Sequence, residues 1–427
     1  MEALISGCLS VFAIAIYVNP KLCSWFWGIW SVGMMIHTFV NPKNRANFIA
    51  FHRTYRVWMI VVLIPLVTGI STLWSLATPK ECFHVWHKYL HFLVILLVLP
   101  YFTHHPACVQ RLLKMFVWVS AFYCLYTFFK RGVGSWFDIN PSFSIICGSV
   151  YIACILSFIT LNILTKDANV VNLTQLIFFT VFLFLVNAQR TGSAASVLSL
   201  FILCAIATIH AIRNRQSSAK SKRKTLKNVI WVCGIRFAVV VLACRLFAPL
   251  YGMICHKMSR EGVREGVREG VRRRINAVLK QYSLCEPRSV MAICGWISYT
   301  VHPIHGWGLG SYPLLTKYFW PEDLMKKFEF FWLSHHEWLL WMIEFGVFGA
   351  LLLILWFGWV ARYLWKNRRY SPFYASYGGI FQVIFLFSGC CDGMLHPIGV
   401  QSVYVLGTCS CIAMIEREKL KSLQKTA

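Results

Sequence analysis

The sequence is poor in acidic residues. Only 16 of its 427 residues are Asp or Glu, against 42 Lys and Arg, which gives a formal net charge of +26. The only aspartates are Asp138, Asp167, Asp323 and Asp392, and no Asp-x-Asp pair occurs. Because Mg²⁺ and Mn²⁺ are held mainly by carboxylate oxygens, a site for either ion is hard to assemble from this chain. We therefore expect chemistry that needs no metal ion and no other cofactor.

Two sequence signals of other protein classes are also missing. The 17 cysteines include no Cys-x-x-Cys pair. Most lie inside apolar runs, as Cys124 and Cys204 do, and are expected to behave as small buried hydrophobic residues. The N-terminus lacks the basic region and small-residue cleavage site of a signal peptide, so we expect its first apolar segment to be a retained helix.

Apolar residues dominate the composition. They make up 58% of the chain, and the mean hydropathy is +0.59. Many apolar runs are long enough to cross a hydrocarbon layer of roughly 30 Å, and helices satisfy their own backbone groups there. The sequence predicts an all-α polytopic membrane protein with about twelve transmembrane helices. The expected spans are roughly 2–19, 22–40, 57–76, 88–103, 112–129, 143–164, 172–188, 192–212, 229–248, 337–361, 373–391 and 398–415.

The basic connectors predict the orientation of these spans. If twelve spans alternate, all the basic clusters fall on one side, which should be the cytoplasm. The clusters are 43–56, 111–114, 213–228, 362–369 and the tail 417–425. The excess charge is expected to meet anionic lipid headgroups, and nucleic acid is an improbable partner for a chain with so little soluble mass.

The same alternation divides the chain into three regions. Residues 1–248 form a transmembrane bundle of about nine helices, which includes Arg190 and the basic cytoplasmic loop 213–228. Residues 249–336 form one large loop domain on the outer side, and 337–427 form about three further helices and a cytoplasmic tail.

Candidate chemical groups converge on the outer side. His335 and His336 lie at the mouth of the span that begins near 337, and Arg190 lies between two spans with almost no connector. Arg288 belongs to the large loop. Two guanidinium groups can clamp a departing diphosphate, while an imidazole takes a proton from an attacking hydroxyl. Membrane anchoring for the histidines and snorkelling for Arg190 are the alternatives.

Three other features of this region have simpler interpretations. The glycines of Gly306-Trp307-Gly308-Leu309-Gly310 predict a close backbone turn that supports the helix behind it. Glu337 and Glu344 fall near one helix face, and we expect packing roles for them. Histidines at or near the outer side leave a zinc site as an alternative, without Cys or acid spacing to support it. They are His84, His87, His91, His302, His305, His335, His336 and His396.

At these residues the chain resembles the bacterial O-antigen ligase family, within the wider O-antigen ligase and polymerase superfamily. Ser334-His335-His336-Glu337-Trp338-Leu339 is similar to the family's His-Asn-x-x-Leu motif, with His336 in place of Asn. Glu344-Phe345-Gly346-Val347-Phe348-Gly349 is similar to its Glu-x-Gly-x-x-Gly continuation. Support comes from Gln189-Arg190-Thr191-Gly192 and from Arg288 upstream of the segment 302–308.

The resemblance implies a metal-independent inverting glycosyltransferase with a GT-C-like fold, in the bacterial inner membrane with its active site facing the periplasm. The donor would be an O-antigen polysaccharide on undecaprenyl diphosphate, and the acceptor a hydroxyl of lipid A-core. His335 would be the base, with Arg190 and Arg288 at the diphosphate. His336 is left as a substrate-binding group or as the base itself.

The Arg-Glu-Gly-Val repeat over 260–274 adds further candidates. It ends in Arg272, Arg273 and Arg274, which can replace Arg288 as the second clamp. At helical pitch its arginines follow one stripe that can meet phosphates, although an expanded repeat without chemistry is equally open.

Two other functions stay open. An O-antigen polymerase or a protein O-oligosaccharyltransferase would share the donor chemistry and differ in acceptor. A transporter is disfavoured, because we find no clear polar residues at midspan and no related halves with broken helices.

Overall fold

The structure is a computed structural model that describes residues 7–8, 11, 20–54, 60–131, six residues between 154 and 162, and residues 287–319, 336–389 and 398–426. About 90% of these residues are helical, and none of them forms a strand. The prediction of an all-α chain is therefore confirmed for the part of the chain that the structure describes.

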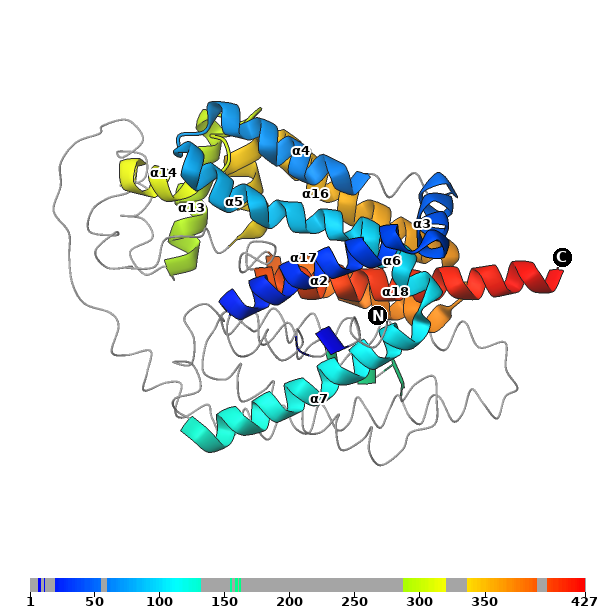
Figure 1. Cartoon of the computed structure of the whole chain (residues 1–427). Coiled ribbons are helices and arrows are strands. Elements are labelled where there is room, and N and C mark those ends of the chain that lie inside the picture. The colour runs from blue at the N-terminus through cyan, green and yellow to red at the C-terminus, as the bar shows by residue number, and fades with distance from the viewer. Residues whose placement is uncertain are drawn as a thin grey trace, which may run out of the picture.

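Most of the described helices run side by side in a bundle (Figure 1). Its members are α2 (Pro20–Val40), α4 (Leu63–Ile70) with η2 (Ser71–Trp74), α5 (Pro79–Leu90) with η3 (His91–Leu93) and α6 (Val94–His104), α7 (Pro106–Arg131), α16 (Glu337–Asn367), α17 (Pro372–Gly389) and α18 (Ile398–Thr426). Helix α3 (Pro42–Thr54) crosses one end, while α13 (Pro287–Val301) and α14 (Tyr312–Phe319) lie at the other (Figure 1).

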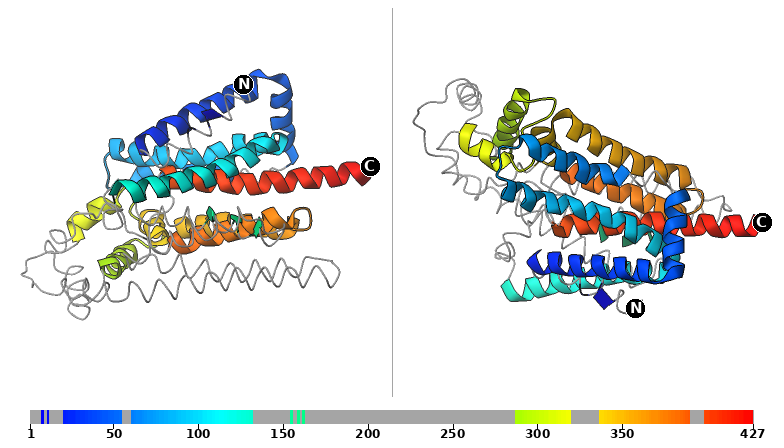
Figure 2. Two further views of the ribbon diagram at one scale, coloured as in Figure 1. Left: turned by 90° about the horizontal axis from the view of Figure 1, so that it is seen from below. Right: turned by 45° about the horizontal axis from the view of Figure 1, so that its top comes forward.

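Helix α18 occupies the middle of the bundle, with α6 and α17 packed along it (Figure 2). Nearly all its residues from Val400 to Glu416 are buried, polar ones included. Tyr404 at its centre accepts a hydrogen bond from Trp356 Nε1 at 2.8 Å and donates one to Gln382 Oε1 at 2.6 Å. Such bonds between helices hold neighbours in register where the surroundings offer no water. They fix α16 and α17 to α18.

Two helical stretches, Pro79–His104 and Glu337–Asn367, are long and apolar enough to cross a membrane by length and composition. Helix α2 adds a second sign of an apolar environment, because it exposes a stripe of large apolar side chains while its opposite face is buried. The exposed stripe consists of Trp25, Ile29, Val32, Ile36 and Val40, with exposed fractions of 71%, 58%, 52%, 50% and 73%.

The described residues of the predicted spans 22–40, 57–76, 88–103, 112–129, 337–361, 373–391 and 398–415 fall on helices, except 75–76. The spans 172–188, 192–212 and 229–248 lie outside the described residues, and 2–19 and 143–164 lie largely outside them. One boundary prediction was wrong: residues 77–87, expected to be a connector, belong mostly to α5. The helix starts early because Thr78 and Glu81 form a capping box, with Pro79 at the first helical position.

The basic clusters within the described residues gather at one end of the bundle. The chain turns at this end through α3, between α6 and α7, and between α16 and α17, and α18 ends there (Figure 1). These turns carry the predicted clusters 43–53, 111–114, 362–369 and 417–421. Their position at one end of the bundle agrees with a common side, and the assignment of that side to the cytoplasm stays a prediction. We call this the basic end.

Candidate functional site

Most of the predicted site residues lie outside the described residues. They are Arg190, Arg272, Arg273, Arg274 and His335. Arg288 is in the first turn of α13, where the backbone is described, and His336 is the residue before α16. The described part of the candidate site is therefore the start of α16 and what packs on it.

Helix α13 lies beside the start of α16. A Cβ atom on Gly295 of α13 would lie 2.8 Å from Leu339 Cδ2, and the Pro303 carbonyl after α13 accepts the Val347 N–H at 2.9 Å. Later residues of α13 thus meet later residues of α16, so the two segments run in the same direction. Arg288, at the beginning of α13, is consequently on the side where α16 begins.

His336 caps the N-terminus of α16. Its backbone is extended, with φ −153° and ψ 100°, and its Nδ1 accepts the Leu339 N–H at 3.2 Å. Burial lowers the pKa of this imidazole from its ordinary 6.5, so the neutral form is favoured. With Nδ1 accepting a hydrogen bond, the proton of the neutral ring is on Nε2. His336 in this state is a hydrogen-bond donor at Nε2.

Glu337 is buried and accepts a hydrogen bond from Trp341 one turn later. The distance from Trp341 Nε1 to Glu337 Oε1 is 2.7 Å, and Glu337 is only 3% exposed. This contact agrees with the predicted packing role. A small apolar pocket between α16 and α17, with a cavity volume of about 10 Å³, adjoins it and is lined by Glu337, Trp338, Phe357 and Phe385.

Helix α16 is broken at Gly346, which the sequence analysis did not predict. Gly346 has φ 65° and ψ −154°, a conformation that is essentially restricted to glycine. A Cβ atom there would lie 2.1 Å from the carbonyl oxygen of Ile304. The backbone of the 302–311 loop thus occupies the space that a side chain at 346 would need.

The 302–311 loop supplies the hydrogen bonds that the break removes. Trp307 N–H donates to the Ile343 carbonyl and Gly308 N–H donates to the Glu344 carbonyl, each at 2.8 Å. Within an unbroken helix those carbonyls would accept from residues four positions later. Gly306, Gly308 and Gly310 all have positive φ, at 69°, 88° and 75°. The predicted close turn that supports this helix is therefore confirmed.

The side chain of Glu344 ties the same loop to α16. Its Oε1 accepts the Gly310 N–H at 3.0 Å, and the residue is 3% exposed. Its Oε2 is buried without a hydrogen-bond partner among the described residues. Lys88 on α5 lies close enough to interact electrostatically with this carboxylate. The backbone N–H groups of Gly310 and Tyr312 both interact with this buried carboxyl group, which therefore binds the end of the loop to α16.

A third segment, at the corner between η2 and α5, closes on the loop. Ser75 Oγ donates to the Leu309 carbonyl at 2.6 Å, and Leu76 N–H donates to Ser311 Oγ at 3.1 Å. Gly308 lies so near that a Cβ on it would be 2.4 Å from Ser75 Cα. Sequence reasoning missed Ser75 and Ser311, because nothing in their local pattern points to a partner more than two hundred residues away. We call this three-segment contact, made by residues 74–77, 302–311 and 343–347, the outer junction.

The histidines of α5, η3 and the 302–311 loop contact one another in pairs. Ring centroids are 5.3 Å apart for His84 and His87, 6.1 Å for His87 and His91, and 5.3 Å for His302 and His305. Across the described ranges, no three His, Cys, Asp or Glu side chains are placed to hold a metal ion together. His335 and His396 lie outside those ranges.

The arrangement at the start of α16 provides a capped helix end, an imidazole favoured in its neutral form with the proton on Nε2, and the beginning of the Arg288 helix beside it. No protein-family model matches the chain, and no curated protein matches it.

Proposed function

We propose that the chain is an O-antigen ligase: a glycosyltransferase that moves O-antigen polysaccharide from undecaprenyl diphosphate to a hydroxyl of lipid A-core. The single observation that supports this most is the outer junction. In it, the Glu344-x-Gly346 part of the motif shared with the ligase family has a definite physical task. It breaks α16 and fixes the short helical piece that begins after His336, the residue that follows His335 in the sequence.

The proposed reaction is a direct displacement. The acceptor hydroxyl attacks the anomeric carbon of the donor sugar, the bond from that carbon to the diphosphate oxygen breaks, and undecaprenyl diphosphate leaves with the electron pair. His335 takes the hydroxyl proton, and the charge on the departing diphosphate is met by Arg190 and Arg288, or by Arg272, Arg273 or Arg274 in place of Arg288. The configuration at the anomeric carbon inverts.

The capping bond of His336 supports His335 as the base. A base must have an unprotonated nitrogen facing its substrate, and the Nδ1 of His336 already accepts the Leu339 N–H. Its Nε2 carries the proton and suits hydrogen bonding to a sugar or phosphate oxygen. We therefore assign substrate binding to His336 and proton transfer to His335.

The location of the site also fits a lipid-carried donor. The candidate site lies at the end of the bundle opposite the basic end, which by the positive-inside rule corresponds to the periplasmic side of a bacterial inner membrane.

A deletion strain tests the proposal. Loss of the protein should leave unligated O-antigen on its carrier lipid and lipopolysaccharide without polymer, as seen by gel analysis of lipid extracts. Lipopolysaccharide that bears a single repeat unit would instead identify a polymerase. Normal lipopolysaccharide with a glycoprotein defect would identify a protein oligosaccharyltransferase, and solute transport by liposomes that contain the purified protein would contradict all three enzyme assignments.

A further inference from the structure

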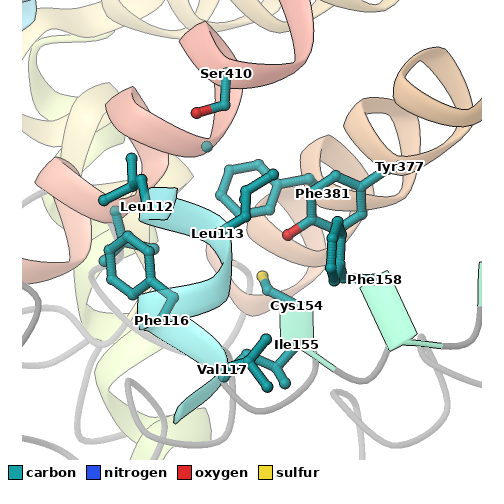
Figure 3. A pocket seen from close by; sticks show the side chains of 12 residues that line it. Leu112, Leu113, Phe116, Val117, Cys154, Ile155, Phe158, Tyr377, Phe381 and Ser410 are labelled. Atoms are coloured by element: carbon teal, nitrogen blue, oxygen red, sulfur yellow. The ribbon is translucent and has the colours of Figure 1, made fainter. Parts of the chain in front are cut away.

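A narrow apolar pocket with a cavity volume of about 40 Å³ lies between α7, the described residues from 154 to 158, α17 and α18 (Figure 3). Apart from Tyr377, Gly407 and Ser410, every lining side chain is apolar. Side chains such as Phe116 and Ile155 converge on it from different segments (Figure 3). It belongs to none of the segments that form the outer junction.

The pocket is in the half of the bundle nearer the basic end. Leu112 lies in the second turn of α7 and Tyr377 in the second turn of α17, and the pocket extends from there to Val117, Phe381 and Val403, nearer the middle of the bundle. Both helices begin at the basic end. The pocket is thus on the side opposite the start of α16, away from the proposed sugar transfer.

The lining favours a hydrocarbon chain as the occupant. Helices in a membrane gain stability from close packing, so a concave apolar surface that helices leave unfilled is best occupied by a lipid chain. A sugar or a peptide would find few hydrogen-bonding groups in it. The preference for a hydrocarbon occupant requires the protein to be embedded in a membrane. It does not depend on the sugar transfer proposed above.

Ser410 indicates where the ester end of the hydrocarbon chain lies. Its hydroxyl is buried, with 1% of the residue exposed, and has no hydrogen-bond partner among the described residues. A buried hydroxyl donor favours an acceptor, and the ester carbonyl at the top of an acyl chain is one. Prenyl lipids have no such ester, so the hydroxyl favours an acyl lipid over the donor's carrier.

Basic side chains stand beyond Ser410, toward the basic end. Arg111 and Lys114 flank the lining residues of α7, and Arg417 follows on α18 and interacts electrostatically with Tyr374 on α17. None of these three cations forms an ion pair within the described residues, whereas Lys419 and Lys421 are paired with Glu416 and Glu418. Basic sites between transmembrane helices on the cytoplasmic side suit anionic headgroups.

We propose that this pocket binds one acyl chain of an anionic diacyl phospholipid from the leaflet at the basic end. The chain fills the space between α7, α17 and α18, the ester carbonyl accepts the Ser410 hydroxyl, and the phosphate meets Arg111, Lys114 and Arg417. The lipid then acts as a structural ligand that holds α7 against the core of the bundle.

Native mass spectrometry of the full-length protein tests this. The protein is purified in mild detergent, depleted of lipid, and titrated with mixed micelles that contain phosphatidylglycerol or phosphatidylcholine with the same acyl chains. We expect one phosphatidylglycerol to bind preferentially. Ser410→Phe fills the pocket and should reduce that binding at least tenfold, whereas Ile354→Phe, a matched change at a position that is 57% exposed on α16, should not.

A second pair of changes leaves the pocket itself intact. Arg111→Gln with Lys114→Gln should reduce the preference for phosphatidylglycerol by about fivefold or more, on the order of the effect of one surface cation on an anionic lipid, without reducing phosphatidylcholine binding. If Ser410→Phe fails to fold, this double variant still tests whether the pocket binds an anionic phospholipid. Equal binding of both lipids, unchanged binding in the variants, or tighter retention of a prenyl phosphate than of either phospholipid would each overturn the proposal.

Discussion

Glu344 and Gly310 are joined by a hydrogen bond of 3.0 Å from the backbone N–H of the glycine to the carboxylate Oε1, although they are 34 residues apart. The backbone of Glu344 also accepts the Gly308 N–H. One residue of α16 therefore holds the 302–311 loop through both its side chain and its carbonyl. This makes the outer junction testable by small changes.

Glu344→Gln should preserve the junction, and Glu344→Ala should weaken it. Glutamine keeps an oxygen that accepts the Gly310 N–H, whereas alanine leaves that buried N–H without its acceptor, at a cost of about 1–3 kcal/mol. Thermal unfolding of the two purified variants in the same detergent measures the difference. Equal midpoints would show that the hydrogen bond adds nothing to stability.

Gly346→Ala should destabilise the protein strongly. Alanine is strained at φ 65° and ψ −154°, and its Cβ would meet the Ile304 carbonyl. Gly358→Ala in the same helix is the matched control, because a Cβ there meets nothing within 4 Å. The control should be neutral or stabilising by about 0.5–1 kcal/mol. Unfolding midpoints and membrane yields give the comparison, and similar behaviour of the two variants would rule out the break as a structural requirement.

His336 should make stability depend on pH. Burial lowers its pKa in the folded state below the ordinary 6.5, so the unfolded chain binds the proton first as the pH falls. The stabilisation is thus fully present above about pH 6.5 and is lost as the pH falls below it.

Asparagine is the matched replacement for His336, because it caps helices well and does not titrate. The difference in unfolding midpoint between the native protein and His336→Asn should change in favour of the variant between pH 7.5 and pH 5.5. His336→Ala, without a cap, should cost about 0.5–2 kcal/mol at either pH. A difference between the native protein and His336→Asn that does not vary with pH would contradict the assignment.

Activity should separate the two histidines. His335→Ala and Arg190→Ala are each expected to abolish transfer in a ligation assay, by about 10²-fold or more, while leaving membrane insertion intact. His336→Asn keeps the helix cap and a side-chain N–H donor for the substrate, so it should lower transfer far less than either of these changes. Retained transfer in His335→Ala together with its loss in His336→Asn would move the base by one position.

The sequence predicted the glycine turn at 306–310 and its supporting role, because three closely spaced glycines have few other uses in a folded loop. It did not predict the break at Gly346. A single glycine within an apolar run is common in membrane helices, and its positive φ is set by the backbone of Ile304, which only the fold brings near. The capping box of Thr78 and Glu81, by contrast, has a sequence pattern typical of a helix start, so the early beginning of α5 was predictable.

The outer junction also sets an order of events during synthesis. Ser75 and Leu309, which it joins, are separated by 234 positions. At translation rates of about 5–20 residues per second, the corner at residues 74–77 waits roughly 10–50 s for its partner to be made. During that interval the outer corner of the early helices is incomplete. Chain termination anywhere before the loop is made would leave this corner open, so that only a polypeptide extending past Val347 can acquire the aligned end of α16.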